Sequence, residues 1–355
     1  MLPGPTTLKK IVHGLHRHRE RARAATGKGP VRQLAEMVYA GTKGFTAEDY
    51  YILPLYGGEN WEYLGRRHYS RLNAYLNPQC TGVVPFNKWV SSRFFVGAGL
   101  PTPAVHGYYH PERGIDLERR PLRTLDALRS LLDRCGGDVV LKPVDGGQGR
   151  NILVLAKCDM AGGVLTKTNG EAMSLDAFHD FLRLEDEGWL IQERVVQHEA
   201  IDRVHPFSLN TLRIMTLVLD DGTLATPICR LRMGRNREPN DNMVSGGIAC
   251  HIDPATGRCG PGMFAYGDEQ HTHHPDTGTA IQGLVIPHWQ AARALVIEAH
   301  QLLPFPRDLA WDIGITPDGP VLIEVNSFWS SSNCQKPDNN LRDLPYGDLI
   351  ARLGW

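Results

Sequence analysis

A pair of short alternating segments near the C-terminus constrains the fold of this chain more than any other feature. Residues 311–314 and 323–326 flank the turn Pro317-Asp318-Gly319-Pro320, and apolar and polar residues alternate on both sides. This alternation is typical of half-buried strands joined as a hairpin. A hairpin centred on the aspartate of the turn pairs Asp312 with Glu324, because each lies six residues from that centre.

The two faces of this hairpin have different expected environments. Residues two apart along a strand share a face, so Asn326 points to the same side as Glu324. The intervening apolar side chains are expected on the opposite face, inside a core: Trp311, Ile313, Ile323 and Val325.

Asp312 and Glu324 together predict a cation site. Two carboxylates about 5 Å apart across a ladder repel each other unless a cation lies between them. Oxygen ligands of this kind suit Mg²⁺, whose coordination shell is completed by water and substrate phosphates. The alternative is a solvent-facing strand pair on which two carboxylates are opposite each other by chance.

Length and composition bound the class of protein. Of the 355 residues, 42% are apolar and 22% charged, and the formal net charge is −1, as in an ordinary globular protein. No charge excess indicates nucleic acid or an acidic membrane, and no apolar run approaches the roughly 20 residues that span a bilayer. The N-terminus lacks the apolar core of a secretory signal. The seven cysteines form no CxxC pair, so reduced thiols in a cytoplasmic protein are expected.

The first 32 residues are strongly basic. Between Lys9 and Arg32 there are eight lysines and arginines against one acid, Glu20. Such a run is either a basic arm for an acidic partner or the solvated face of a helix. The pattern of residues 33–80 is mostly helical.

A glycine-rich loop follows a buried strand, expected at residues 138–143. The loop, residues 145–150, holds three glycines in four positions: Gly146, Gly147 and Gly149, around Gln148. Its backbone amides could approach an anion closely, and the loop could swing as a lid. Lys142, inside the apolar strand, needs a partner, which a nucleotide phosphate would provide. Neither a GxxxxGK[ST] nor a helix-opening GxGxxG motif is present, and a plain hairpin turn is the alternative.

A second hairpin carries arginines. Residues 210–219 and 223–233 are expected to pair over Asp221-Gly222, a strong short-range turn signal. By this count Arg213 faces Arg230, and Arg232 lies on the same face. Like charges directly opposite are destabilising unless an anion or an acidic side chain lies between them. The site is therefore either an anion site or a set of ion pairs with acids such as Glu193 or Asp241.

The remaining pattern indicates an α+β fold rather than a doubly wound parallel sheet, because strands, helices and hairpins are mixed. Further helices are expected at residues 88–98, 174–184 and 288–303, and further strands at 151–155 and 189–193.

The order and spacing of these motifs resemble the ATP-grasp superfamily over residues 86–335. The chain is most similar to the subgroup that is related to α-L-glutamate ligases and described as sugar-transfer-associated. The resemblance implies an ATP-grasp fold in which two α+β subdomains hold ATP. The expected regions are a mostly helical N-terminal region with its basic arm (1–85), a central subdomain (86–195) and a C-terminal subdomain (196–355).

The resemblance also implies roles for individual residues. Lys88 and Lys142 would contact phosphates under a lid of Gly146, Gly147, Gln148 and Gly149. Backbone groups of Glu193 and Val195 would read adenine, and Glu199 would take the ribose hydroxyls. Asp312, Glu324 and Asn326 would bind magnesium, expected as two ions. Arg213, with Arg230 opposite it, would stabilise an anion.

Two segments depart from the family's pattern. Residues 327–332 replace the proline- and glycine-containing substrate loop of many ligases, so the acceptor pocket is not transferred by analogy. The segment 266–283, with His271, His273 and His274, has no obvious counterpart in the family. Cys250, His251 and Cys259 precede it, and their spacing fits no standard zinc pattern. A polar surface loop is the expectation, and a structural zinc site the alternative.

The function expected from these observations is an ATP-dependent carboxylate–amine ligase that releases ADP and phosphate. The γ-phosphoryl group would pass to a small-molecule or peptide carboxylate, and an amine would attack the acyl phosphate to form an amide. Phosphoryl transfer requires mainly positioning and charge neutralisation, and the arginines would stabilise the oxyanion. A phosphotransferase and a nucleotide-binding protein without turnover are the alternatives. No nucleic-acid partner is expected, and the sequence leaves the oligomeric state open.

Overall fold

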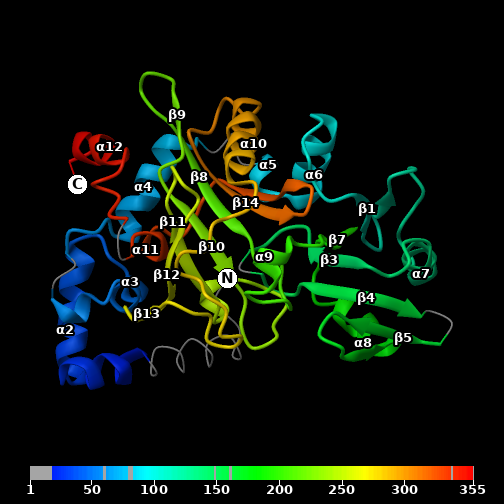
Figure 1. Cartoon of the computed structure of the whole chain (residues 1–355), viewed down its shortest axis with the longest axis horizontal. Helices are drawn as coiled ribbons and strands as arrows, with labels where there is room; N and C mark the ends of the chain where they lie inside the picture. The colour runs from blue at the N-terminus through cyan, green and yellow to red at the C-terminus, as the bar shows by residue number, and fades with distance from the viewer. Residues whose placement is uncertain are drawn as a thin grey trace. The chain divides into compact units, whose positions relative to one another are not determined.

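The computed structural model describes residues 18–58, 61–78, 83–147, 149–159, 162–336 and 339–354 (Figure 1). The basic residues Lys9, Lys10 and Arg17 and the lid residue Gln148 lie outside these ranges. The chain forms two compact units, each described by itself below. The helical unit comes from the described parts of Met1–Leu76, Met263–Glu269 and Trp329–Trp355, and the two-sheet unit from Asn77–Gly262 and Gln270–Phe328.

The first sheet of the two-sheet unit has seven strands in the described part of the chain, in the order β2-β1-β7-β3-β4-β5-β6. The strands are β1 (Val105–Tyr109), β2 (Ile115–Asp116), β3 (Val139–Pro143), β4 (Leu153–Asp159), β5 (Val164–Lys167), β6 (Ala172–Ser174) and β7 (Trp189–Glu193). All neighbours pair antiparallel.

Two amphipathic helices cover this sheet, α7 (Leu125–Arg134) and α8 (Leu175–Leu182). Each begins at a hydroxyl cap, since Thr124 accepts a hydrogen bond from the backbone of Ala127 and Ser174 one from Ala177. Their leucines and Phe178 pack on the apolar residues of β3, β4 and β7 in one core.

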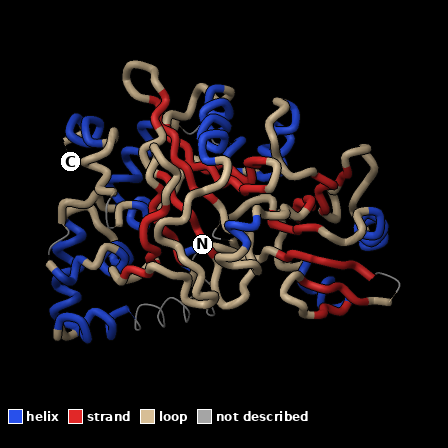
Figure 2. Tube along the Cα trace, viewed as in Figure 1, coloured by secondary structure: helices blue, strands red, loops and turns tan. Residues whose placement is uncertain are grey.

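The second sheet has the order β13-β12-β11-β10-β8-β14-β15, with β9 paired to β8. The strands are β8 (Leu212–Val218), β9 (Leu224–Ala225), β10 (Cys229–Met233), β11 (Ile248–Ile252), β12 (Cys259–Phe264), β13 (Gln270–His271), β14 (Asp308–Thr316) and β15 (Gly319–Asn326). Figure 2 shows how the strands, in red, gather into these two sheets.

Helix α10 (Trp289–Gln301) packs on β8, β14 and β15 (Figure 1), and α6 (Lys88–Gly97) also packs on β15. Shorter helices of this unit are α5 (Val83–Phe86), α9 (Glu199–Asp202) and the 3₁₀ turn η3 (Met243–Ser245). The helices expected at 88–98, 174–184 and 288–303 are thus confirmed to within a few residues.

The predicted pairing of Asp312 with Glu324 is confirmed, although the turn was miscounted. The loop contains Pro317 and Asp318, because Thr316 pairs with Gly319. A bulge then leaves Ile323 without a partner and restores the Asp312–Glu324 pair. The expectation that Ile323 points into the core is wrong, because the bulge interrupts the alternation and Ile323 lines a cavity instead.

The arginine hairpin shows the same kind of compensation. Arg213 pairs with Arg230 as predicted, yet the turn is one residue longer than expected, because the backbone N–H of Leu219 donates to the carbonyl of Thr223. The expected second strand is also divided into β9 and β10. The break between β9 and β10 shifts the strand register by one residue, which offsets the longer turn and brings Arg230 opposite Arg213.

The helical unit contains α2 (Pro30–Thr42), α3 (Ala47–Ile52), η1 (Leu55–Gly57), α4 (Arg66–Leu76), α11 (Ser331–Cys334) and α12 (Gly347–Arg352). Its core is rich in aromatic residues, including Phe45, Tyr50 and Tyr51. The buried Gln335 joins distant segments, since its side-chain amide both accepts from and donates to the backbone of Leu64, at 2.9 and 3.0 Å. The α+β class and the mostly helical N-terminal region are therefore confirmed. Within the residues described, no helix is long and apolar enough to cross a bilayer.

A chain of hydrogen bonds supports the second sheet behind the Asp312 hairpin. His300 Nε2 lies 2.9 Å from the carbonyl oxygen of Pro306, which can only accept, so this nitrogen carries the proton. The Thr216 hydroxyl therefore donates to His300 Nδ1 at 2.6 Å, and it accepts from Trp311 Nε1 at 2.8 Å. All three side chains are buried.

Thr216→Val should destabilise the protein by about 1–3 kcal/mol, because it leaves the buried Trp311 N–H and His300 Nδ1 without partners. Thr216→Ser is the matched control, since it keeps the hydroxyl and removes one methyl group. Chemical denaturation would measure both. Equal stability of Thr216→Val and wild type, or a larger loss in Thr216→Ser, would contradict this role of the hydroxyl.

Candidate functional site

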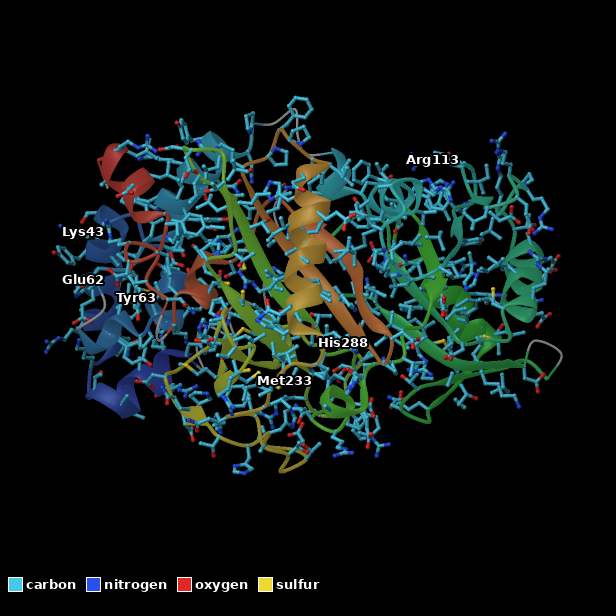
Figure 3. The ribbon with its side chains drawn as sticks, turned by 45° about the horizontal axis from the view of Figure 1, so that its top comes forward. Lys43, Glu62, Tyr63, Arg113, Met233 and His288 are labelled. Atoms are coloured by element: carbon cyan, nitrogen blue, oxygen red, sulfur yellow. The ribbon has the colours of Figure 1, made fainter. Side chains whose placement is uncertain are left out.

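A cavity of about 870 Å³ lies between the two sheets of the two-sheet unit. The first sheet contributes residues of β3, β4 and β7, and the second contributes residues of β8, β10, β14 and β15. The cavity therefore brings together the lysine strand, the arginine hairpin and the Asp312 hairpin, which are far apart in the sequence. Figure 3 shows Met233, the last residue of β10, in the second sheet.

Most of the residues predicted to form the site line this one cavity. They are Lys88, Lys142, Gly146, Gly147, Gly149, Glu193, Val195, Glu199, Arg213, Asp312, Glu324 and Asn326. Arg230 is buried opposite Arg213 and is not among the lining residues. Arg232, two residues further on, lines the cavity in its place.

Asp312 is clamped by two arginines. Arg213 donates from Nε and Nη2 to its two carboxylate oxygens, at 2.5 and 2.9 Å. Arg232 Nη2 lies 3.1 Å from Oδ2. Burial acts to raise the pKa of Asp312, but the two guanidinium groups and their hydrogen bonds hold it below its usual range. Asp312, in its ionised form, is therefore the acid between Arg213 and Arg232. Neither of the two acids suggested from the sequence, Glu193 and Asp241, fills this position alone.

Two lysines face the other strand of this hairpin. Lys88 Nζ lies 3.6 Å from Glu324 Oε1 and donates to the carbonyl of Gly146 at 2.7 Å. Lys142 is buried, and its Nζ lies 3.4 Å from the carbonyl oxygen of Ile323. Burial lowers the pKa of Lys142 to about 8, while the nearby Glu324 carboxylate acts against this shift. An added anion beside Lys142 would favour its charged form.

The oxygen donors of the Asp312 hairpin fit a hard cation. Asp312 and Glu324 are paired across the ladder, and Asn326 lines the same cavity. No group of three or more His, Cys, Asp or Glu side chains capable of holding a metal occurs among the described residues. A cation here would therefore depend on two carboxylates, an amide oxygen, and further oxygens from water or substrate.

The glycine loop lies beside the second sheet's loops. Gly146 and Gly149 have φ angles of +90° and +65°, in the left-handed region that favours glycine. A Cβ added to Gly149 would lie 3.1 Å from Cβ of Asn240, another residue that lines the cavity. The loop therefore covers the cavity closely enough to touch the segment after β10.

A buried carboxylate supports Arg232 from behind. Asp241 Oδ2 accepts from the backbone N–H and the hydroxyl of Thr211, at 2.9 and 2.5 Å. Arg232 Nη2 donates to the Thr211 hydroxyl at 2.6 Å and lies 3.3 Å from Asp241 Oδ1. Asp241 thus extends the charge network from Asp312 to the loop after β10. From the sequence, Asp241 was predicted only as one possible ion-pair partner of the arginines.

A second polar network shapes the wall formed by residues 197–211, and sequence reasoning missed it. Asn210 donates to the carbonyl of His205 at 2.8 Å, and its backbone N–H donates to Gln197 Oε1 at 3.1 Å. Asn210 Oδ1 accepts from the Ser208 hydroxyl at 2.9 Å, so His205 Nδ1 donates to Ser208, also at 2.9 Å. The Nδ1 atom of His205 therefore carries a proton, and burial lowers the pKa of the ring to about 4, so that His205 is neutral at pH 7. The polar run in the sequence gives no periodic signal of these contacts.

The residues assigned to adenine and ribose line the cavity as well. The backbone N–H of Glu193 donates to the carbonyl of Ala104 at 2.8 Å, which fixes the end of β7. Glu199 forms an ion pair with Arg203, one turn further along the chain, and this pairing lowers its pKa. The roles of Glu193, Val195 and Glu199 stay predictions.

Most of the histidine segment 266–283 is exposed, as expected of a polar surface loop, but His274 is an exception and Gln270–His271 forms the short strand β13. His274 is buried, with Nε2 at 2.9 Å from the carbonyl oxygen of Gly234, and its ring lies 5.5 Å from that of His205. Cys250 and Cys259 are buried free thiols. The zinc alternative finds no support in the described residues, where no metal-binding group of this kind is present.

The architecture and the charged cavity together define an ATP-grasp protein. A family model described as sugar-transfer associated ATP-grasp matches residues 67–341. The chain belongs to this family, and the resemblance noted in the sequence is confirmed.

Solved structures give more distant similarities. Biotin carboxylase from Campylobacter jejuni is 11% identical, with 75% of this chain and 46% of that chain covered and a TM-score of 0.44. N5-carboxyaminoimidazole ribonucleotide synthetase from Thermus thermophilus is 15% identical (77% and 56% covered, TM-score 0.41). The ATP-grasp ligase PsnB is 15% identical (78% and 60% covered, TM-score 0.39). The chain spans about half the length of such structures, and no curated protein matches it significantly.

The network around His205 predicts a pH-dependent stability. Burial lowers the pKa of His205 from 6.5 to about 4, and the nearby His274 adds to this shift. The unfolded chain therefore takes up a proton first as the pH falls. The contribution of the neutral His205 to the free energy of unfolding is therefore full above pH 6.5 and decreases as the pH falls towards 4.

We expect His205→Asn to flatten this dependence, because asparagine retains a donor for Ser208 and does not titrate. Between pH 7 and 5 the wild type should lose about 2 kcal/mol more stability than the variant. Urea denaturation at several pH values would measure the difference. Parallel stability curves for the two proteins would show that His205 is not a buried neutral histidine.

Proposed function

We propose that this chain is an ATP-dependent carboxylate–amine ligase that acts through an acyl phosphate and releases ADP and phosphate. The observation that carries the proposal is one cavity lined by Lys88 and Lys142, by the Asp312–Glu324 hairpin, and by the arginines that pair with Asp312. Membership of the ATP-grasp family supports the binding of ATP. The reaction type rests on the chemistry of the lining residues.

The nucleotide would lie between the proposed central (86–195) and C-terminal (196–355) subdomains. Glu193 and Val195 would read adenine, and Glu199 would bind the ribose. Lys88 and Lys142 would hold the phosphates, since both ammonium groups lie within the cavity and Lys142 is stabilised in its charged form by an adjacent anion. The glycine loop would cover the phosphates and exclude water.

Magnesium fits the donor set of Asp312, Glu324 and Asn326. When bound, Mg²⁺ would neutralise the phosphate charge during transfer, and the expected pair of ions is part of this proposal. Arg213 and Arg232 keep Asp312 ionised, so that it is available as a ligand.

Arg213 would serve the second half of the reaction. Its guanidinium lines the cavity beside the hairpin, where a substrate carboxylate and then the oxyanion of the tetrahedral intermediate would lie. Arg232, which lines the same cavity, would share this role. Arg230 is buried outside the lining, and its catalytic role stays a prediction.

Glu324→Gln should abolish ATP turnover and leave the fold intact. The variant loses a carboxylate ligand and the partner of Lys88, which lies 3.6 Å away. Wild type should be stabilised by ATP with Mg²⁺, by about 2.7 kcal/mol at a hundredfold excess over Kd, and the variant should lose the Mg²⁺-dependent part. Glu187→Gln, an exposed position outside the cavity, is the control. Full turnover in Glu324→Gln, or turnover indifferent to chelation, contradicts the metal assignment.

Hydroxylamine distinguishes a ligase from a phosphotransferase. An acyl phosphate is a reactive mixed anhydride, so hydroxylamine should attack its carbonyl carbon, displace phosphate and give a hydroxamate. We expect ADP release that depends on an added carboxylate, together with hydroxamate when hydroxylamine replaces the amine. A stable phosphorylated product without hydroxamate would show a phosphotransferase instead, and AMP with pyrophosphate would show adenylation.

A further inference from the structure

Helix α2 of the helical unit places two polar residues, Gln33 and Glu36, on its inner side and several large apolar residues on its outer side. Its large exposed residues are Val31 (81% exposed), Leu34 (60%), Val38 (66%) and Tyr39 (52%). The inward side carries Gln33, fully buried, and Glu36. Single exposed apolar residues are common on protein surfaces, but a helix whose outer face is apolar marks an interaction site.

The inward polar residues fix this orientation. Gln33 Nε2 donates to the carbonyls of Lys28 and Arg19, at 2.8 and 3.1 Å, and Gln33 Oε1 accepts from the Tyr51 hydroxyl at 3.2 Å. Glu36 accepts from the Tyr50 hydroxyl at 2.7 Å and pairs with Lys28 Nζ at 2.9 Å. Rotating α2 to bury its apolar face would break these contacts, so they keep this face at the surface of the helical unit.

A groove of about 910 Å³ runs beside this face. Leu34, Met37 and Val38 of α2 line it together with Phe45, and Arg19 and Arg67 line it as well. The groove thus combines apolar walls with two guanidinium groups.

The surroundings of the face are cationic. Arg32 lies on α2, and Lys43 follows its last turn (Figure 3), with Nζ 5.9 Å from the centre of the Tyr39 ring. Among the described residues, the acids near this face are Glu20, 3.9 Å from Arg19, and Glu36, which points inward and also pairs with Arg32 at 3.4 Å. The exposed Glu62 is a third, because it follows Trp61, whose ring lies 5.3 Å from that of Tyr39. Arg19, Arg32, Lys43 and Arg67 outnumber these acids, so the region carries a small positive charge although the net charge of the chain is −1.

We propose that α2 and its groove form a docking surface for an anionic phospholipid bilayer. Val31, Leu34 and Val38 would insert among the acyl chains, and the arginines and Lys43 would contact the phosphate headgroups. Apolar insertion and a basic patch together supply the two contributions that stable peripheral binding requires. The helix, roughly 20 Å long from its 13 residues, would lie in the plane of the interface.

Charge complementarity favours the bilayer over a second copy of this chain. A symmetric contact brings the same patch of both copies together, so the basic side chains of both copies would be gathered in one interface. Like charges brought together in this way are unfavourable. An anionic surface neutralises them instead.

Flotation of the full-length chain with vesicles tests the proposal. Vesicles of phosphatidylcholine alone would be compared with vesicles of phosphatidylcholine and phosphatidylglycerol in equal amounts. We expect binding to the anionic vesicles, weakened by added salt as screening increases. No binding to the anionic vesicles would overturn the proposal.

Two leucine variants separate the helix face from general basic charge, including that of Lys9 and Lys10. Leu34→Glu should weaken binding at least about tenfold, because it removes an inserted side chain and adds a negative charge. Leu184→Glu is the matched control: Leu184 is 58% exposed, against 60% for Leu34, and lies in the two-sheet unit. It should bind as wild type does, and unchanged thermal unfolding would show that both variants fold.

Equal binding of Leu34→Glu and wild type would overturn the proposal, as would equal losses in both variants. Concentration-dependent self-association that Leu34→Glu abolishes, without vesicle binding by wild type, would assign the face to a second copy. The test uses no nucleotide, so its outcome is independent of the ligase assay.

Discussion

The site depends on one buried carboxylate, that of Asp312. Burial disfavours a charge at this position, and two guanidinium groups make it favourable. The same ion pairs hold Arg213 and Arg232 on adjacent strands without repulsion, so the sheet register and the charge of the site support each other. Because metal ligands must be deprotonated, a carboxylate kept ionised in this way is suited to bind a cation. It also leaves the arginines positive and directed into the cavity.

The surrounding network makes this arrangement rigid. Asp241 and Thr211 hold Arg232 from behind, at 2.6–3.3 Å, and the hydrogen-bonded wall of Gln197, Ser208 and Asn210 fixes the adjacent loop. On the other side, Lys88 links Glu324 to the glycine loop through the carbonyl of Gly146. Asp312, Glu324, Arg213, Arg232 and Lys88 thus each have a charged partner before substrate arrives. Preorganised charge of this kind is what phosphoryl transfer requires.

Local patterning predicted the two hairpins and therefore much of the site. Alternation places Asp312 opposite Glu324 and Arg213 opposite Arg230, and the structure has both pairs. The predicted length of each turn was wrong by one residue, and an irregularity further along each hairpin restored the predicted pairing. Core packing fixes the register of the side chains more strongly than the turn does. Contacts between distant segments gave no sequence signal. The pairing of Arg213 with Asp312 and the burial of His274 depend on which strands become neighbours, and local periodicity does not specify that.

We propose that Asp312 serves both the arginines and a nucleotide-bound cation. A crystal structure of the chain with ADP and Mn²⁺, with anomalous diffraction recorded for manganese, tests it most directly. The account predicts a manganese peak in contact with oxygens of both Asp312 and Glu324, on the phosphate side of the hairpin, with Arg213 still hydrogen-bonded to Asp312. Manganese bound to phosphate away from these carboxylates, with Asp312 contacting only Arg213 and Arg232, would contradict it.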